Sequence, residues 1–258
     1  MSRIFDMSDE DLNRLRTNAL RYLDDPKRSA EAQLKLDEIE SELKRRYLPG
    51  MIQTFLNAYP EGFHDRQQIV VERDYKLAAR NLCLELLGEE QFSVLLKNQD
   101  WAELYARAKR LINMTNLMQP SFEKPRLLDA LQDPAKGPKF FTALYEVLWG
   151  GEEFNERFQH YCDTLEELDL FKWTYATYFV FLADSKYGMF VKPEMLKKSL
   201  EKSRYPLTYE SAPTAALYKD ILKFCHWLKL NIAELEPRDL IDVHSFMWHM
   251  APTGKWEE

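Results

Sequence analysis

A short C-terminal stretch of this chain groups side chains that could do acid-base chemistry. Arg238, Asp239 and Asp242 supply a cation and two carboxylates, and His244 follows two residues later. Carboxylates at this spacing are suited to general-base catalysis or metal binding. A structural role is the other interpretation, because carboxylates in the first turn of a helix are favoured by its dipole and its free amide groups. We expect the structural role and keep an enzyme that uses Asp239 and Asp242 as the alternative.

His244 is expected in the core rather than in a catalytic site. In a helix that begins at Pro237, it shares a face with Leu240 and Met247 and so lies on the apolar side. We expect such a histidine to be satisfied by one hydrogen bond. His244 and His249 are five residues apart rather than four, and no cysteine is near, so we expect no metal site here.

A basic and aromatic segment offers a different chemistry. Residues 186–204 contain six basic and two acidic side chains, so their net charge is +4. The net charge of the whole chain is -7, so that of the remaining residues is -11. Lysines and arginines bind phosphates, and flat rings stack on bases. A solvated helix face beside packed aromatic residues would give the same pattern. The predicted nucleic-acid-binding residues are Lys172, Trp173, Lys186, Tyr187, Lys192, Lys197, Lys198, Lys202 and Arg204.

Helical patterns dominate the first half of the chain. A capped start at Ser8 and a second run from Ser29 to Arg46 predict an antiparallel helical hairpin. Pro49-Gly50 indicates that residues 48–68 form a connector. The helical period returns after residue 72, and Asp100 is expected to cap another helix. If the hairpin docks a partner protein, the chain is an interaction scaffold.

The second half carries the signals for a domain boundary and for β-structure. Four prolines within residues 119–139 predict a linker between a helical domain, 1–118, and an α+β domain, 140–258. The aromatic and β-branched residues from Trp173 to Ala183, with the turn-like residues that follow, predict a β-hairpin. The expected fold class is therefore mainly α (α+β), with a helical N-terminal half and one small β-hairpin or sheet in the C-terminal half.

Composition removes several classes of protein. The 8 glycines among 258 residues stand where no dinucleotide fingerprint, phosphate loop or nucleophile elbow can be written. Three widely spaced cysteines exclude a paired-cysteine metal or redox motif and favour a reducing compartment. The N-terminus does not match a signal peptide, and no apolar run has the length of a membrane span. We expect a cytoplasmic protein with no cofactor and no membrane association.

Several ordered blocks in the C-terminal half resemble a family of uncharacterised bacterial proteins. The blocks are Lys172-Trp173 with Thr177, Phe181 to Asp184, Met189 to Pro193, and Pro237 to Trp248. The resemblance implies no established activity. It implies an accessory role near DNA-handling or phage-defence genes, and the family more often has glutamine where this chain has His244.

Together these patterns predict a non-enzymatic, cytosolic bacterial protein that binds or regulates. Its expected partner is DNA or RNA, held by the basic and aromatic segment. An enzyme of unrecognised family and a protein-interaction scaffold are the alternatives.

Overall fold

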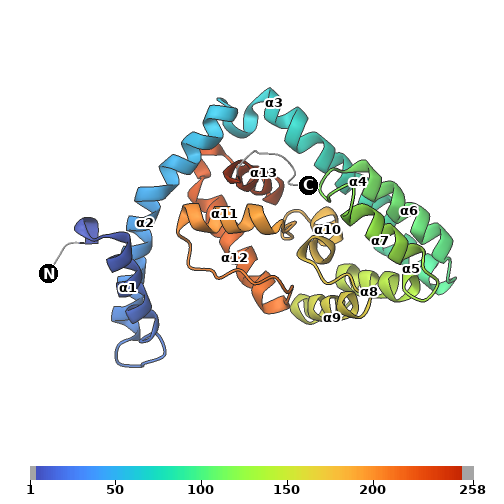
Figure 1. Cartoon of the computed structure of the whole chain (residues 1–258), viewed down its shortest axis with the longest axis horizontal. Coiled ribbons are helices and arrows are strands. Elements are labelled where there is room, and N and C mark those ends of the chain that lie inside the picture. Colours follow the sequence, from blue (N-terminus) through green and yellow to red (C-terminus); the bar gives the residue numbers. More distant parts are fainter. Residues whose placement is uncertain (1–3, 252–258) are drawn as a thin grey trace.

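The computed structural model describes residues 4–251, and its regular structure is entirely helical (Figure 1). No residue in this range belongs to a β-strand. The α-helices are α1 (Asp9–Leu20), α2 (Ser29–Ala58), α3 (Arg66–Gln68), α4 (Asp74–Leu87), α5 (Glu89–Lys97), α6 (Trp101–Met114), α7 (Glu123–Gln132), α8 (Gly137–Trp149), α9 (Phe154–Glu167), α10 (Trp173–Ala183), α11 (Pro193–Ser203), α12 (Ala215–Asn231) and α13 (Leu240–Met250). Short 3-10 turns are η1 (Ile4–Asp6), η2 (Gly62–His64) and η4 (Ala233–Leu235), and a π-helical turn, η3 (Ile69–Arg73), joins α3 to α4.

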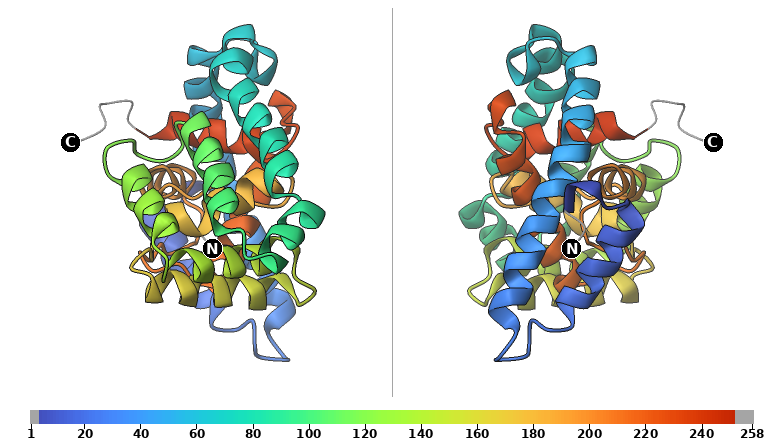
Figure 2. Two further views of the ribbon diagram at one scale, coloured as in Figure 1. Left: turned by 90° about the vertical axis from the view of Figure 1, so that its right-hand side faces the viewer. Right: turned by 90° about the vertical axis from the view of Figure 1, so that its left-hand side faces the viewer.

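The predicted N-terminal hairpin is confirmed. The Ser8 hydroxyl caps α1 by accepting from the Asp11 amide, and α1 packs along the first half of α2 (Figure 2, right). A small apolar cluster of Leu12, Ile39 and Leu43 joins the two helices. The second half of α2 leaves this cluster and packs against the rest of the molecule through α11 and α13.

The connector predicted for residues 48–68 is wrong for its first half, because α2 continues to Ala58 with Pro49 inside it. Proline removes one backbone hydrogen bond and costs a helix interior about 3 kcal/mol. The residues that follow anchor the helix, since Met51, Ile52 and Phe55 are all buried in the main core. Tertiary packing therefore outweighs the local signal for a break.

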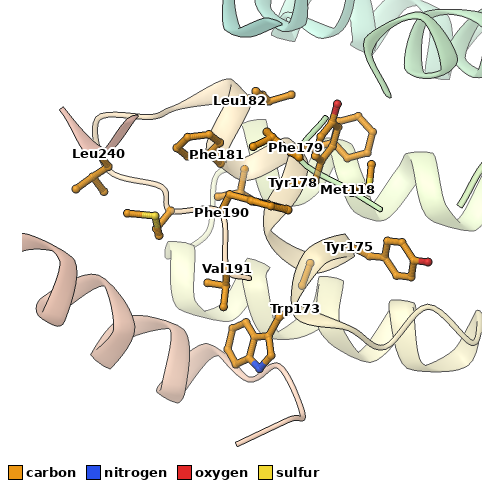
Figure 3. Close-up of a cluster of buried hydrophobic side chains, with 14 of the residues drawn as sticks. Met118, Trp173, Tyr175, Tyr178, Phe179, Phe181, Leu182, Phe190, Val191 and Leu240 are labelled. Atoms are coloured by element: carbon orange, nitrogen blue, oxygen red, sulfur yellow. The ribbon is translucent and has the colours of Figure 1, made fainter. Parts of the chain in front are cut away.

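The predicted β-hairpin is also wrong, because Trp173–Ala183 forms helix α10. This helix packs against α4, α8 and α9, and all but its last residue is buried (Figure 3). A helix that is covered on all sides shows no polar stripe, so its sequence resembles that of a buried strand. Residues 189–191 then run as irregular chain. Side chains replace strand pairing there: the Met189 amide donates to the Tyr218 hydroxyl, and the Val191 amide donates to Thr177 Oγ1, both at 2.9 Å.

Residues 119–139, expected as a linker, contain α7 and the start of α8. Pro125 and Pro138 lie in first turns, where a missing amide hydrogen breaks no helical bond. Leu127 and Leu131 of α7 belong to the same apolar core as residues from Leu48 to Met250. One core thus crosses the boundary expected between residues 118 and 140.

Candidate functional site

The C-terminal acidic residues lie at the start of α13, three residues later than the helix start predicted at Pro237. The backbone amide of Arg238 donates a hydrogen bond to Asp242 Oδ2 at 2.8 Å. A side-chain carboxylate therefore satisfies this amide, and Arg238 stays outside the helix. Asp239 is the N-cap and accepts from the amides of Ile241 and Asp242. The capping role expected for an aspartate at this helix start is confirmed for Asp239.

Arg73, at the end of the π-helical turn, reaches both aspartates. Its Nη1 lies 2.9 Å from Asp239 Oδ1 and 2.9 Å from Asp242 Oδ1, and its Nη2 lies 2.8 Å from Asp239 Oδ2. Arg238 adds bonds of 2.8 and 3.0 Å from Nε and Nη2 to the two oxygens of Asp242. The structure therefore brings together the three residues of the predicted cluster and completes it with Arg73.

These contacts change how the charged groups titrate. Burial alone would raise the pKa of Asp239, but the hydrogen bonds and the charge of Arg73 outweigh it and hold that pKa below its ordinary value. For Arg73, burial opposes the charge, yet the two aspartates keep its pKa above the ordinary value. Both groups remain charged at neutral pH, so this cluster is suited to holding α13 against η3 rather than to proton transfer.

Lys76 lies in the first turn of α4, three residues after Arg73, and is fully buried. Its Nζ donates to Glu72 Oε2 at 2.8 Å and to Ser245 Oγ at 3.1 Å. Burial lowers the pKa of Lys76, and the nearby Glu72 carboxylate partly offsets that effect. The lysine thereby links α4 to the middle of α13.

His244 occupies the apolar face of α13, as expected, but without the hydrogen bond that was expected. It is 3% exposed and packs against the rings of Phe181 and Phe190, with ring centres 5.5 and 5.8 Å away. Neither ring nitrogen has a hydrogen-bond partner among residues 4–251. Burial, with the charges of Lys76 and Lys192, holds the pKa of His244 well below its ordinary value, so the imidazole is neutral.

A small polar cavity adjoins His244. Its volume is about 60 Å³. Lys192 lies in its wall with Nζ 4.7 Å from the centre of the Trp248 ring, and burial lowers the pKa of Lys192 to about 8. The cavity thus joins a cation, a carboxylate, a phenol, an amide and a neutral imidazole. The lining residues are Glu72, Tyr75, Asn116, Leu117, Lys192, His244 and Trp248.

Sequence patterns did not identify Glu72, Arg73, Lys76 or Asn116 as site residues. One signal was present: Lys76 precedes the buried residues Ala79 and Cys83 by three and seven positions, which places a lysine on the apolar face of α4. The π-helical turn gave no recognisable sequence signal, although such turns frequently occur at functional sites.

The residues of the predicted nucleic-acid surface do not form one patch. Trp173 is 1% exposed and donates its indole N–H to the Glu210 carbonyl. Lys192 lines the small cavity, whereas Lys172 lines a separate hollow with Arg126 and Tyr175. Lys186 and Tyr187 form an exposed cation-π pair in the loop after α10.

Four of the predicted residues do lie together on α11 and its C-terminal cap: Lys197, Lys198, Lys202 and Arg204. Lys197 pairs with Glu194 and Lys198 with Glu201, at 2.7 and 2.8 Å. Next to them, a groove of about 340 Å³ separates α11 from α1. The side chains lining it are Asn13, Arg16, Lys197, Leu200, Glu201, Arg204, Tyr205, Leu207 and Tyr209.

Comparison with known proteins assigns no family: no family model, no curated protein and no solved structure matches the chain. Within residues 4–251, no three histidine, cysteine or carboxylate side chains are grouped so that they could hold a metal ion. None of the helices in that range is both long enough and apolar enough to cross a lipid bilayer.

Proposed function

We propose that this chain is a non-enzymatic binding protein that holds a small carboxylate-bearing molecule in the cavity beside Lys192 and His244. The observation that carries the proposal is the convergence on one small cavity of the half-buried Lys192 and the His244 imidazole, whose ring nitrogens have no hydrogen-bond partner within residues 4–251. Perturbed ionisable groups that line a cavity in this way are typical of binding sites.

The size of the cavity limits the ligand. Its volume is about 60 Å³, and one water molecule takes roughly 30 Å³ in the liquid. A carboxylate with one or two further heavy atoms matches this volume.

The charges favour an anion. Glu72 is already bonded to Lys76, so these two charges compensate each other. Lys192 adds a cation to the wall, and a pKa near 8 keeps most of it protonated at pH 7. Asn116, Tyr75 and His244 add groups that can hydrogen-bond to carboxylate oxygens or to a neighbouring hydroxyl.

Calorimetric titration with formate, acetate and glyoxylate tests the proposal, with chloride as the control for ionic strength. We expect at least one acid to bind and Lys192→Met to weaken that binding by about tenfold or more. Lys223→Met is the matched control, because Lys223 is an exposed lysine on α12 that does not line the cavity. The proposal would be overturned if no acid binds, or if the native chain, Lys192→Met and Lys223→Met bind the acid equally well.

The groove between α1 and α11 supports a second candidate, association with DNA or RNA. Arg16, Lys197 and Arg204 line it with Tyr205 and Tyr209, which combines cations for phosphates with rings for stacking. The surface pairs of Lys197 and Lys198 contribute little stability, so these lysines can exchange their partners for phosphates.

A gel-shift titration of labelled DNA and RNA over a range of salt concentrations tests this candidate. We expect binding that weakens with salt and is lost in Lys197→Glu/Lys198→Glu. Lys219→Glu/Lys223→Glu makes the same charge change on α12 and should retain binding. Salt-independent binding, or equal loss in both double variants, would contradict a specific role for α11.

A further inference from the structure

Lys192 is placed in the cavity by two local constraints. It is the N-cap residue of α11, and Pro193 follows it in the first turn. Its amine lies against the Trp248 ring on one side, and the cavity lies alongside. Because the cavity is so small, a molecule that enters it brings every one of its atoms close to the walls, including the wall formed by Lys192.

A lysine reacts as a nucleophile only in its neutral form. Burial is the largest cause that lowers the pKa of Lys192 to about 8, and the neighbouring cation Lys76 adds to it. The start of a helix also disfavours a positive charge. At pH 8 about half of the amine is neutral, roughly a hundredfold more than for an ordinary lysine with a pKa near 10.4.

The other walls supply the groups that imine formation needs. Burial raises the pKa of Tyr75, so this residue stays a neutral phenol that can donate a proton. The His244 imidazole is neutral and has no hydrogen-bond partner among the described residues, so it can bond to an added hydroxyl. Glu72 supplies a carboxylate to the same cavity, although Lys76 also binds it.

From this geometry we infer that Lys192 is a covalent attachment site for a small oxo acid, a molecule that has an aldehyde or ketone next to a carboxylate. The inference rests on the proposed function, since the carboxylate is what the cavity selects. The Lys192 nitrogen attacks the carbonyl carbon and gives a carbinolamine. A proton passes from nitrogen to the departing oxygen through the lining groups, water leaves, and a C=N bond replaces the C=O bond. Amine and oxo acid thus give imine and water, and no oxidant or reductant takes part.

The test uses glyoxylate as the probe and cyanoborohydride to trap the imine. The full chain is incubated with both at pH 8, and peptide mass spectrometry locates the carboxymethyl group that reduction leaves. We expect Lys192 to be modified at least about tenfold faster than the exposed Lys186 and Lys223. Acetate should slow modification of Lys192 alone, because it occupies the cavity but has no carbonyl that forms an imine.

Lys192→Arg separates this inference from the proposed function. The variant keeps the cation and removes the nucleophile, so glyoxylate should still bind in calorimetry and leave no adduct in the cavity. Lys192→Gln serves as a second variant if arginine prevents folding, and it should also give no adduct there. If glyoxylate binds but Lys192 is unmodified, or is modified no faster than Lys186, the covalent inference is wrong and the binding proposal stands. If no acid binds, both are wrong.

Discussion

Asp242 is the residue on which the buried ionic contacts converge. It is fully buried and accepts hydrogen bonds from Arg73 and from the backbone and side chain of Arg238. A buried carboxylate is stable only with such partners, because its transfer out of water is costly. Its neighbours depend on it in turn, since Arg73 is itself buried.

Asp242→Ala should therefore lower the free energy of unfolding by about 3 kcal/mol or more, because it leaves part of a buried cation unpaired. Urea denaturation followed by circular dichroism measures the loss. Asp220→Ala is the control: Asp220 forms an exposed ion pair with Lys223 on α12, and its loss should change stability by no more than about 0.5 kcal/mol. Similar losses in both variants would contradict a dominant role for the buried cluster.

His244 links stability to pH. Its pKa in the folded protein lies well below the value of 6.5 that applies to an unfolded chain, so the unfolded chain binds a proton first as the pH falls. The folded state consequently loses stability below pH 6.5, by up to about 1.4 kcal/mol per pH unit from this group. Above pH 6.5 both states are neutral at His244, and its contribution does not change with pH.

His244→Leu should remove this part of the acid sensitivity. Unfolding free energies measured between pH 8 and pH 5 should diverge from those of the native chain below pH 6.5, with the variant losing less stability. Phe190→Leu alters the same wall without removing a titratable group, so it should shift the whole curve and keep its slope. Parallel curves for His244→Leu and the native chain would show that the prediction is wrong.

At the scale of elements, α10 is the central support of the fold. Thr177 stabilises it twice: its hydroxyl donates to the Trp173 carbonyl and accepts from the Val191 amide. The second bond replaces the strand pairing that was expected for this region. It also fixes the irregular chain that leads directly into Lys192 and α11.

Thr177→Val keeps the shape of the side chain but leaves the buried Val191 amide without its acceptor. We expect the free energy of unfolding to fall by about 1–3 kcal/mol. Thr142→Val makes the same change on the exposed face of α8, where the hydroxyl bonds within its own helix, and should cost no more than about 0.5 kcal/mol. Thermal or urea unfolding compares the two variants, and equal effects would argue against the role given to Thr177.

Local signals predicted the helices that have a cap and one apolar face. Ser8 and Asp100 cap α1 and α6 as expected, and Gly88 ends α4. The same signals failed where tertiary packing decides the structure: α10 is apolar on every side, and α2 passes through Pro49. The sequence predicted the C-terminal residues of the site but not Arg73, for a related reason. Arg73 and Asp242 are 169 residues apart, and no periodicity in a sequence reports a pairing across that distance.

At the scale of the whole molecule, one core joins the two halves of the chain. Helices α4 and α6 from the first half pack with α7, α8 and α10 from the second. Buried side chains from the two halves therefore pack in the same core.

Fragments 1–118 and 119–258 should accordingly fail to fold separately. We expect each to lack a cooperative unfolding transition in urea and to contain less helix than its share of the intact chain. The intact chain, measured under the same conditions, is the control. A sharp transition in either fragment would instead support the division into two domains that the prolines suggested.

The pairing of η3 and α4 with α13 also affects how the chain folds during its synthesis. Arg73 leaves the ribosome 166 residues before Asp239, which at about 5–20 residues per second corresponds to roughly 8–33 seconds. Until then Arg73 and Lys76 have no carboxylate or hydroxyl from α13 to bind. We therefore expect this part of the core to close only after α13 has been synthesised.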